Sequence, residues 1–136
     1  MPATLFSVPF VRGKGRVRFV RQTGRTYTPD ATAEAMERIR MAYVEAGGEK
    51  APKGQPVGVL IMVRRPLPAT RPKRMTSEPD VYKPDVDNIA KLVLDALNGC
   101  AWEDDTQVMD LQVMKARRTR GVEPETRVAV VWKEEE

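Results

Sequence analysis

Acidic residues and a lysine are concentrated in residues 83–105, which read KPDVDNIAKLVLDALNGCAWEDD. Asp85 and Asp87 precede a short amphipathic stretch, Lys91 lies within it, and an acidic pair follows at residues 104–105. Carboxylate oxygens are the ligands that Mg²⁺ and Mn²⁺ prefer in proteins. A divalent ion held by them lowers the pKa of bound water and stabilises charge on a phosphoryl transition state. These residue types therefore favour metal-dependent hydrolysis of a phosphodiester.

The spacing within this segment predicts that its side chains converge. Asp85 and Asp87 are two residues apart, and side chains i and i+2 of an extended segment face the same side. Lys91 follows Asp87 by one helical turn on the same face, where its ammonium group can stabilise developing charge. We expect a short helix and a return connection to bring residues 104–105 back beside the helix start. Each residue also has an ordinary alternative role, as a helix cap, a turn or an ion-pair partner.

The distribution of positive charge points to a polyanionic partner. The formal net charge of the 136 residues is +4, but residues 12–25 and 64–74 contain no acidic residue. Such blocks favour contact with phosphates, although many charge runs are simply solvated loops. The basic residues of the two blocks are Arg12, Lys14, Arg16, Arg18, Arg21 and Arg25, and Arg64, Arg65, Arg71, Lys73 and Arg74.

The composition excludes several kinds of chemistry. The chain has no histidine, which removes Ser–His–Asp and Cys–His catalysis and histidine metal sites. The single cysteine, Cys100, rules out an intrachain disulfide and is typical of a reducing compartment. We expect a cytoplasmic protein without a membrane segment, because no apolar run approaches the ~20 residues of a transmembrane helix. The N-terminal residues also lack the pattern of a signal peptide.

The hydrophobic pattern predicts a single α+β domain over residues 1–136, with a mixed β-sheet packed with two main helices. The helices are expected at residues 28–46, before Gly47 and Gly48, and at residues 87–98. Residues 57–63 are nearly all apolar and are expected to form a central strand that is buried on both faces. The other predicted strands are residues 5–11, 16–20, 107–115 and 126–132.

Residues 66–84 contain five prolines among polar and basic residues. Proline cannot donate a backbone hydrogen bond, so we expect a mobile loop without regular structure here. A loop of this length in a compact domain is usually functional or disordered. Residues 134–136 are expected to form a frayed acidic tail.

Several motifs together resemble the RusA family of Holliday junction resolvases. K-G-R-V-R-F at residues 14–19 and G-R-T-Y-T-P at residues 24–29 resemble its N-terminal blocks. K-P-D-V-D-N-I-A-K at residues 83–91, L-D-A-L-N-G at residues 94–99 and W-E-D-D-T-Q-V at residues 102–108 resemble its catalytic core in order and spacing. The resemblance extends over nearly the whole chain.

The resemblance implies a RusA-like fold and a homodimeric endodeoxyribonuclease that depends on Mg²⁺, with Mn²⁺ as a substitute. Such an enzyme resolves four-way DNA junctions by paired symmetric nicks in DNA recombination and repair. By position, Asp85, Asp87 and Asp105 match the metal-binding aspartates of the family, and Lys91 matches its catalytic lysine. The resemblance also implies a phage or prophage origin. We expect no nucleotide cofactor.

The basic residues expected to contact DNA phosphates are Lys14, Arg16, Arg18, Lys73 and Arg74. Three other functions remain open from the sequence. They are a non-catalytic DNA-binding module, a less specific nuclease for branched DNA, and a subunit whose acids bind a protein partner. Metal-dependent nicking separates the nucleases from the others, and a comparison of four-way, three-way and linear DNA separates the two nucleases.

Overall fold

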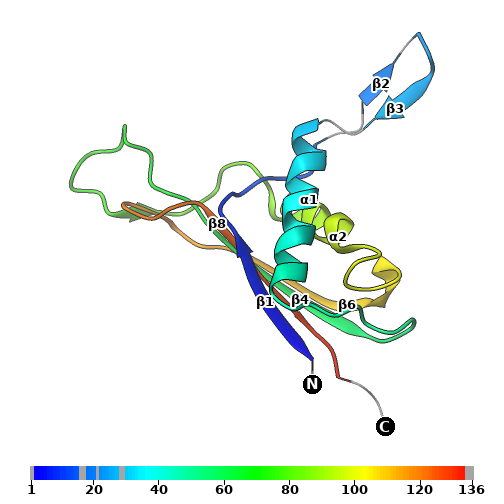
Figure 1. The fold of residues 1–136 in the computed structure, drawn as a ribbon. Helices are drawn as coiled ribbons and strands as arrows, with labels where there is room; N and C mark the ends of the chain where they lie inside the picture. Colours follow the sequence, from blue (N-terminus) through cyan, green and yellow to red (C-terminus); the bar gives the residue numbers. More distant parts are fainter. Residues whose placement is uncertain (1, 16–17, 21, 28–29, 134–136) are drawn as a thin grey trace.

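The fold is a four-stranded mixed sheet with two helices packed on one of its faces (Figure 1). The computed structural model describes residues 2–15, 18–20, 22–27 and 30–133. The predicted α+β class with two main helices is confirmed. In chain order the elements are β1 (Ala3–Val8), β2 (Arg18–Val20), β3 (Arg25–Tyr27), α1 (Asp30–Glu45), β4 (Val57–Arg64), β5 (Ser77–Glu78), α2 (Val86–Leu97), the short 3₁₀ helix η1 (Asp105–Gln107), β6 (Val108–Lys115), β7 (Arg118–Thr119) and β8 (Glu125–Val131).

The strand order of the main sheet is β1-β8-β4-β6. β8 is antiparallel to both of its neighbours, whereas β4 and β6 are parallel. Two parallel strands need a crossover connection, and here α2 lies in the chain between β4 and β6. Because the chain must return before it can repeat a strand direction, α2 runs opposite to both strands. β1 and β6 form the two edges of the sheet.

Both helices are held by one apolar stripe each. α1 buries Ala35, Ile39 and Tyr43 at helical spacing and ends before Gly47, whose φ of 81° is a conformation that glycine adopts readily. The buried residues of α2 are Ile89, Ala90, Leu92, Val93, Ala96 and Leu97. α1 packs beside β1 and α2 packs beside β6, so the two helices cover the same face of the sheet. The predicted helices are confirmed, although residues 28 and 29 lie outside the described part of the chain.

The strand predicted at residues 57–63 is central but is buried on one face only. β4 alternates between buried and accessible residues, and the side chains of Leu60 and Met62 are 45% and 40% exposed. The prediction of burial on both faces is therefore wrong. A run of apolar residues is typical of a strand buried on both faces. In this fold the helices cover only one face of β4, and its other face is apolar but accessible to solvent.

The proline-rich segment contains regular structure, contrary to the prediction for residues 66–84. Within it, β5 pairs with β7 in an antiparallel ladder. Glu78 of β5 accepts hydrogen bonds from Arg71 and Arg118, and these two guanidinium groups lower the pKa of Glu78. Hydrogen bonds to residues distant in sequence therefore hold the segment against β7, the strand that follows β6.

A buried ion cluster holds the end of this segment. The carboxylate of Asp80 is fully buried and accepts hydrogen bonds from Arg65 Nε at 2.9 Å and Arg65 Nη2 at 2.5 Å. Lys115 Nζ lies 3.6 Å from Asp80 Oδ1 and donates to the carbonyl oxygens of Tyr82 and, at 3.1 Å, Pro84. The residues just before Asp85 are therefore anchored to the ends of β4 and β6.

The same cluster determines the charge state of Asp80. Burial by itself would raise the pKa of this carboxyl, but the hydrogen bonds and charge of Arg65 and the charge of Lys115 outweigh it, so the pKa is lowered. The carboxylate form is thus the one that the fold stabilises.

The remaining elements are small. β2 and β3 form a hairpin with Gly24 at positive φ in its turn, and the hairpin extends away from the main sheet (Figure 1). Within the described residues, both helices fall short of the length and apolar character that a bilayer crossing requires.

We expect Asp80→Asn to destabilise the fold by about 3–5 kcal/mol, because it leaves two cations close together without their buried counter-ion. Urea denaturation would measure this, with Asp110→Asn at an exposed position as the control. Since the folded pKa of Asp80 is lowered, the stabilisation is complete above the ordinary value of 3.8 and is lost as the pH falls below it. Equal stability of the two variants at neutral pH would contradict this role.

Candidate active site

The first turn of α2 presents two of the predicted aspartates. Asp85 is the N-cap residue, with extended backbone angles φ −73° and ψ 157°, and its side chain makes no capping hydrogen bond. Asp87 lies inside the first turn. Both side chains are exposed. The carboxylate of Asp85 is therefore available to a ligand, because the helix N–H groups do not engage it.

Lys91 lies four residues after Asp87 on α2 and is also exposed. Residues at this spacing are neighbours on a helix surface. Asp85, Asp87 and Lys91 therefore all lie on the first two turns of one helix, and Asp87 and Lys91 share a face. The expected extended spacing of Asp85 and Asp87 is wrong, because Val86 and Asp87 are already helical, and residues two apart on a helix do not face each other.

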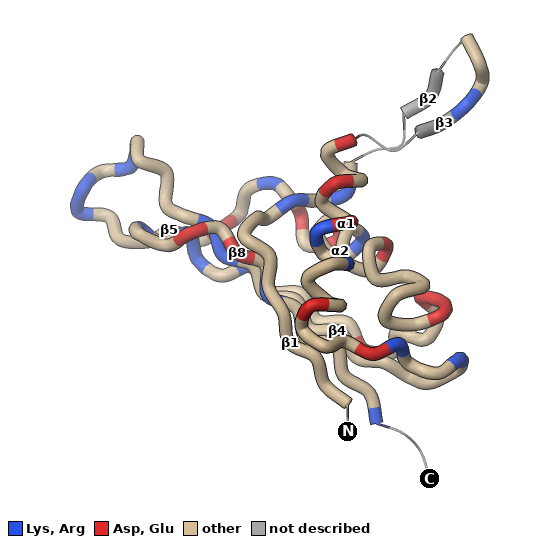
Figure 2. The backbone as a smooth tube through the Cα atoms, viewed as in Figure 1, with Lys and Arg blue, Asp and Glu red and all other residues tan. Residues whose placement is uncertain are grey.

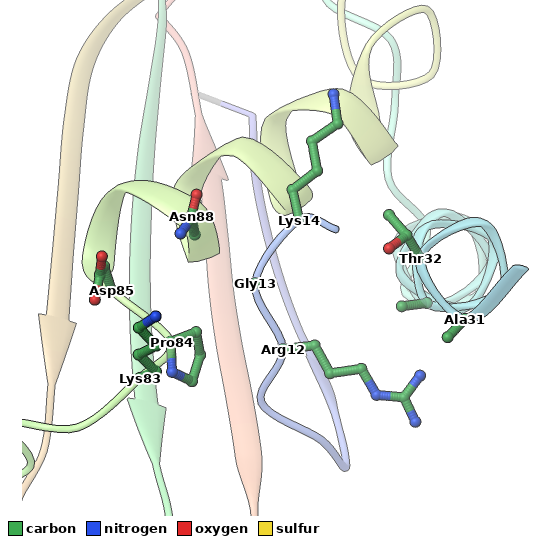
Figure 3. Close-up of a pocket in the computed structure, with 10 residues that line it drawn as sticks. Arg12, Gly13, Lys14, Ala31, Thr32, Lys83, Pro84, Asp85 and Asn88 are labelled. Carbon is green, nitrogen blue, oxygen red and sulfur yellow. The ribbon is translucent and has the colours of Figure 1, made fainter. Parts of the chain in front are cut away.

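A cleft of about 630 Å³ lies beside this helix start (Figure 3). Asp85 and Asn88 line it from α2, Ala31 and Thr32 line it from α1, and residues 12–14 run between the two helices. Arg12, Lys14 and Lys83 add positive charge to the lining. A cleft of this character suits a phosphate group adjacent to the aspartates.

Gly13 allows residues 12–14 to pass close to the start of α2. The backbone N–H of Lys14 donates to the carbonyl oxygen of Asn88 at 3.0 Å, which holds residues 12–14 against α2. A Cβ atom at Gly13 would lie 2.9 Å from the Cβ of Asn88 and 3.0 Å from that of Pro84. Only glycine fits at this close approach without a shift of one of the two chains.

The structure describes the three predicted DNA-contact residues near the N-terminus to different extents. The ammonium group of Lys14 forms an ion pair with Asp95 of α2, and each side chain is 30% exposed. Arg16 lies outside the described residues, and for Arg18 the structure describes only its backbone in β2. The DNA-binding roles of these three residues remain predictions.

The second basic block divides into paired and exposed residues. Arg64 pairs with Glu125, Arg65 with Asp80 and Arg71 with Glu78. Lys73 and Arg74 are exposed residues of the proline-rich segment. Figure 2 shows Lys or Arg residues along the loop that leads to β5. The acidic partners of these arginines lie outside residues 64–74. The absence of acids within the block therefore did not show that its arginines are paired.

Asp105 lies at the other end of α2. Its Oδ1 accepts a hydrogen bond from Trp102 Nε1 at 2.8 Å, and the Asp104 side chain caps η1 through the N–H of Thr106 at 3.0 Å. This region packs where β4 and β6 begin, with the N–H of Ala51 donating to the carbonyl oxygen of Ala101 at 2.8 Å. The start of α2 instead lies where β4 and β6 end, next to Lys115.

The expected return of residues 104–105 to the helix start is therefore wrong within one chain. α2 has 12 residues and is about 18 Å long. Two oxygens bound to the same Mg²⁺ lie only about 3 Å apart. In the described residues, no group of three acidic, cysteine or histidine side chains is close enough to hold a metal ion. The residue that returns to the start of α2 is Lys115, at the end of β6.

The donor set at the start of α2 suits a hard cation. Mg²⁺ is commonly held by one or two carboxylates together with waters and substrate phosphates. Asp85 and Asp87 supply two carboxylates of this kind, and the first of them is free of a capping bond. One chain therefore offers a partial site that fits Mg²⁺ or Mn²⁺, and Asp105 of the same chain does not reach it.

The sequence did not reveal the residues that support this site. Arg65, Asp80 and Lys115 fix the backbone before Asp85, but they lie in three separate stretches of the chain. An acid that is preceded by proline in a basic segment was the only local signal, at Asp80. Its burial depends on strand pairing that the sequence pattern did not predict.

Comparisons with known proteins agree with the motif resemblance. The sequence matches the family described as Endodeoxyribonuclease RusA over residues 9–131, which is nearly the whole chain. It is also 41% identical over 68 residues to Uncharacterized protein YqaN of Bacillus subtilis (strain 168). That alignment covers 44% of this chain and 48% of the relative, so the chain spans about half the length of this curated relative.

Gly13→Ala should displace either residues 12–14 or the first turn of α2, because the added methyl group overlaps both Asn88 and Pro84. We expect a loss of about 1–3 kcal/mol in the free energy of unfolding, as in other overpacked sites. Urea denaturation would measure it, with Ser7→Ala on the open face of β1 as the control. An unchanged stability would show that the close approach at Gly13 is not a constraint.

Proposed function

The chain belongs to the RusA endodeoxyribonuclease family, and from this membership and its α2 site we propose that it cleaves phosphodiester bonds in four-way DNA junctions. The observation that carries the proposal is the exposed start of α2, where Asp85 lines a basic cleft and Asp87 and Lys91 are exposed on the helix. By the motif resemblance, these residues would correspond to the acidic and lysine motif of the family. Their exposure leaves them accessible to a DNA strand.

We propose that the reaction depends on a divalent cation, Mg²⁺ or Mn²⁺. When bound, such an ion supplies Lewis acidity and favours a nucleophilic hydroxide near neutral pH. Asp85 and Asp87 would hold it, since hard oxygen ligands suit both metals. Lys91 would stabilise negative charge as it develops on the phosphate or the leaving oxygen. The cluster of Asp80, Arg65 and Lys115 keeps the backbone before Asp85 in place for this task.

The basic surface would hold the DNA backbone. Arg12 and Lys83 line the cleft beside Asp85, and Lys73 and Arg74 are exposed on the proline-rich segment. Contacts of this kind neutralise phosphates, release counterions and make binding dependent on salt. They would position a junction without reading its sequence.

We propose that the active form is a homodimer that makes paired, symmetric nicks. A four-way junction offers equivalent strands related by two-fold symmetry, and a two-fold dimer presents two equivalent sites. This activity would serve DNA recombination and repair in a bacterial cytoplasm, in keeping with a phage or prophage origin. Hydrolysis at two equivalent sites would require no nucleotide cofactor.

Asp87→Asn should abolish cleavage of a four-way junction and leave junction binding nearly unchanged, because it removes a ligand charge from an exposed position. Cleavage of an end-labelled junction in Mg²⁺ and in EDTA would measure the first property, and gel retardation in EDTA the second. Glu45→Gln, at an exposed acid near the end of α1, is the matched control. Cleavage by Asp87→Asn at the wild-type rate would refute the assignment.

Replacing both Lys73 and Arg74 by alanine should weaken junction binding and flatten its salt dependence. If both contact phosphates, the slope of log K against log salt should fall in magnitude by about 1.8. Binding titrations over a range of salt concentrations would give the slope. The control is Lys53→Ala, an exposed lysine in the loop before β4. A slope equal to that of the wild type would place the proline-rich segment away from DNA.

A further inference from the structure

An exposed aromatic side chain lies directly before the cleft in the chain. Tyr82 is 43% exposed, and the next three residues, 83–85, line the cleft (Figure 3). The other aromatic residues whose side chains the structure describes are buried, namely Phe6, Phe10, Tyr43, Trp102 and Trp132. A single exposed apolar group is common on protein surfaces, so the surroundings of Tyr82 decide whether it has a role.

Contacts on one face and at the hydroxyl group hold the Tyr82 ring in place. The guanidinium carbon of Arg118 lies 3.9 Å from the ring centroid, which is a cation–π contact. Arg118 is itself buried and donates to Glu78. The hydroxyl oxygen of Tyr82 accepts a hydrogen bond from Arg71 Nη2 at 3.3 Å. Because the ring is already positioned, it loses little further freedom when another ring stacks on it.

Lys115 positions both Tyr82 and the start of α2. Its Nζ donates to the carbonyl oxygen of Tyr82 and, at 3.1 Å, to that of Pro84. Each residue spans at most about 3.6 Å, so the Cα atoms of Tyr82 and Asp85 lie within about 11 Å of each other. Successive nucleotides of one DNA strand are about 3.4 Å apart. Tyr82 therefore lies within about three nucleotides of a phosphate bound at Asp85.

We propose that Tyr82 stacks on a base that has lost a stacking neighbour at the branch point of a DNA junction, and that this contact favours branched DNA over continuous duplex. The inference rests on the proposed function for the identity of the substrate. In a continuous duplex each base is covered by its neighbours and presents no free face to the ring. A base at a branch point can present one, and aromatic side chains bind such faces with little dependence on sequence.

A purely structural role for Tyr82 predicts a different result. In that role the ring only covers Arg118, and its hydroxyl group only orders Arg71. A variant would then alter the stability of the fold and affect branched and linear DNA alike. In the stacking role, Tyr82→Phe retains the aromatic face and Tyr82→Leu removes it, and the difference appears with branched DNA alone. The two substitutions together therefore separate the two roles.

Binding of four-way and linear DNA in EDTA tests the proposal without cleavage. Tyr82→Leu should lower the affinity for a four-way junction about 5–150-fold, which corresponds to about 1–3 kcal/mol for stacking on one base. Its affinity for linear duplex should stay at the wild-type value, which also reports that the variant folds. Tyr82→Phe should bind both kinds of DNA as the wild type does. The control is Val81→Ala at the neighbouring residue, which is 81% exposed and should also behave as the wild type.

A fluorescent adenine analogue at the branch point, whose emission is quenched by stacking, gives a second readout. At saturation the wild type and Tyr82→Phe should leave it quenched, and the Tyr82→Leu complex should be brighter. Equal emission in all complexes, an equal loss of affinity for junction and duplex, or a loss in Val81→Ala as large as in Tyr82→Leu overturns the stacking role.

The same measurements distinguish this inference from the proposed function. If the wild type binds junctions with this pattern but does not cleave them in Mg²⁺, the proposed cleavage fails and the stacking role stands. If Tyr82→Leu binds junctions as tightly as a wild type that cleaves them, the stacking role fails and the proposed function stands. A wild type that does not bind junctions overturns both.

Discussion

The parallel pairing of β4 and β6 is the constraint on which the arrangement of the site depends. Two parallel neighbours require a crossover, and the crossover helix α2 must run opposite to both strands. Its first turn therefore lies where the strands end, and its last turn lies where they begin. Asp85 and Asp87 precede or begin the helix, while Asp105 follows it, so one chain separates them by the whole length of α2. The separation follows from the topology and cannot be removed by a local shift of side chains.

The buried cluster around Asp80 converts a proline-rich stretch into a support for this site. Prolines alone would leave residues 66–84 without a fixed path, because they withdraw backbone donors from any ladder. Arg65 at the end of β4 and Lys115 at the end of β6 supply the missing bonds through Asp80 and through the carbonyl oxygens of Tyr82 and Pro84. The Asp80 carboxylate is buried and pairs with both cations, so its removal leaves Arg65 and Lys115 without this counter-ion. The strand ends thereby determine where Asp85 stands.

Local features of this chain were readable from the sequence, and long-range ones were not. The apolar stripes of α1 and α2, and the four-residue spacing of Asp87 and Lys91, are properties of a single helix and needed no tertiary information. The burial of Val59 against the exposure of Leu60 depends on which face the helices cover, which the run of apolar residues does not encode. The pairing of Lys14 with Asp95 joins positions 81 residues apart. The prediction that Asp105 returns to the start of α2 was wrong for the same reason, because it depended on the direction of α2 relative to β6.

The two ends of α2 present different surroundings to the predicted carboxylates. Asp85 and Asp87 are exposed at its start, where Asp85 lines a basic cleft and its side chain makes no capping hydrogen bond. Asp105 follows the other end and accepts a hydrogen bond from Trp102 Nε1. A hard cation at the start of α2 would therefore find Asp85 and Asp87 in this chain, and water and substrate phosphates are the ligands that commonly complete such a shell.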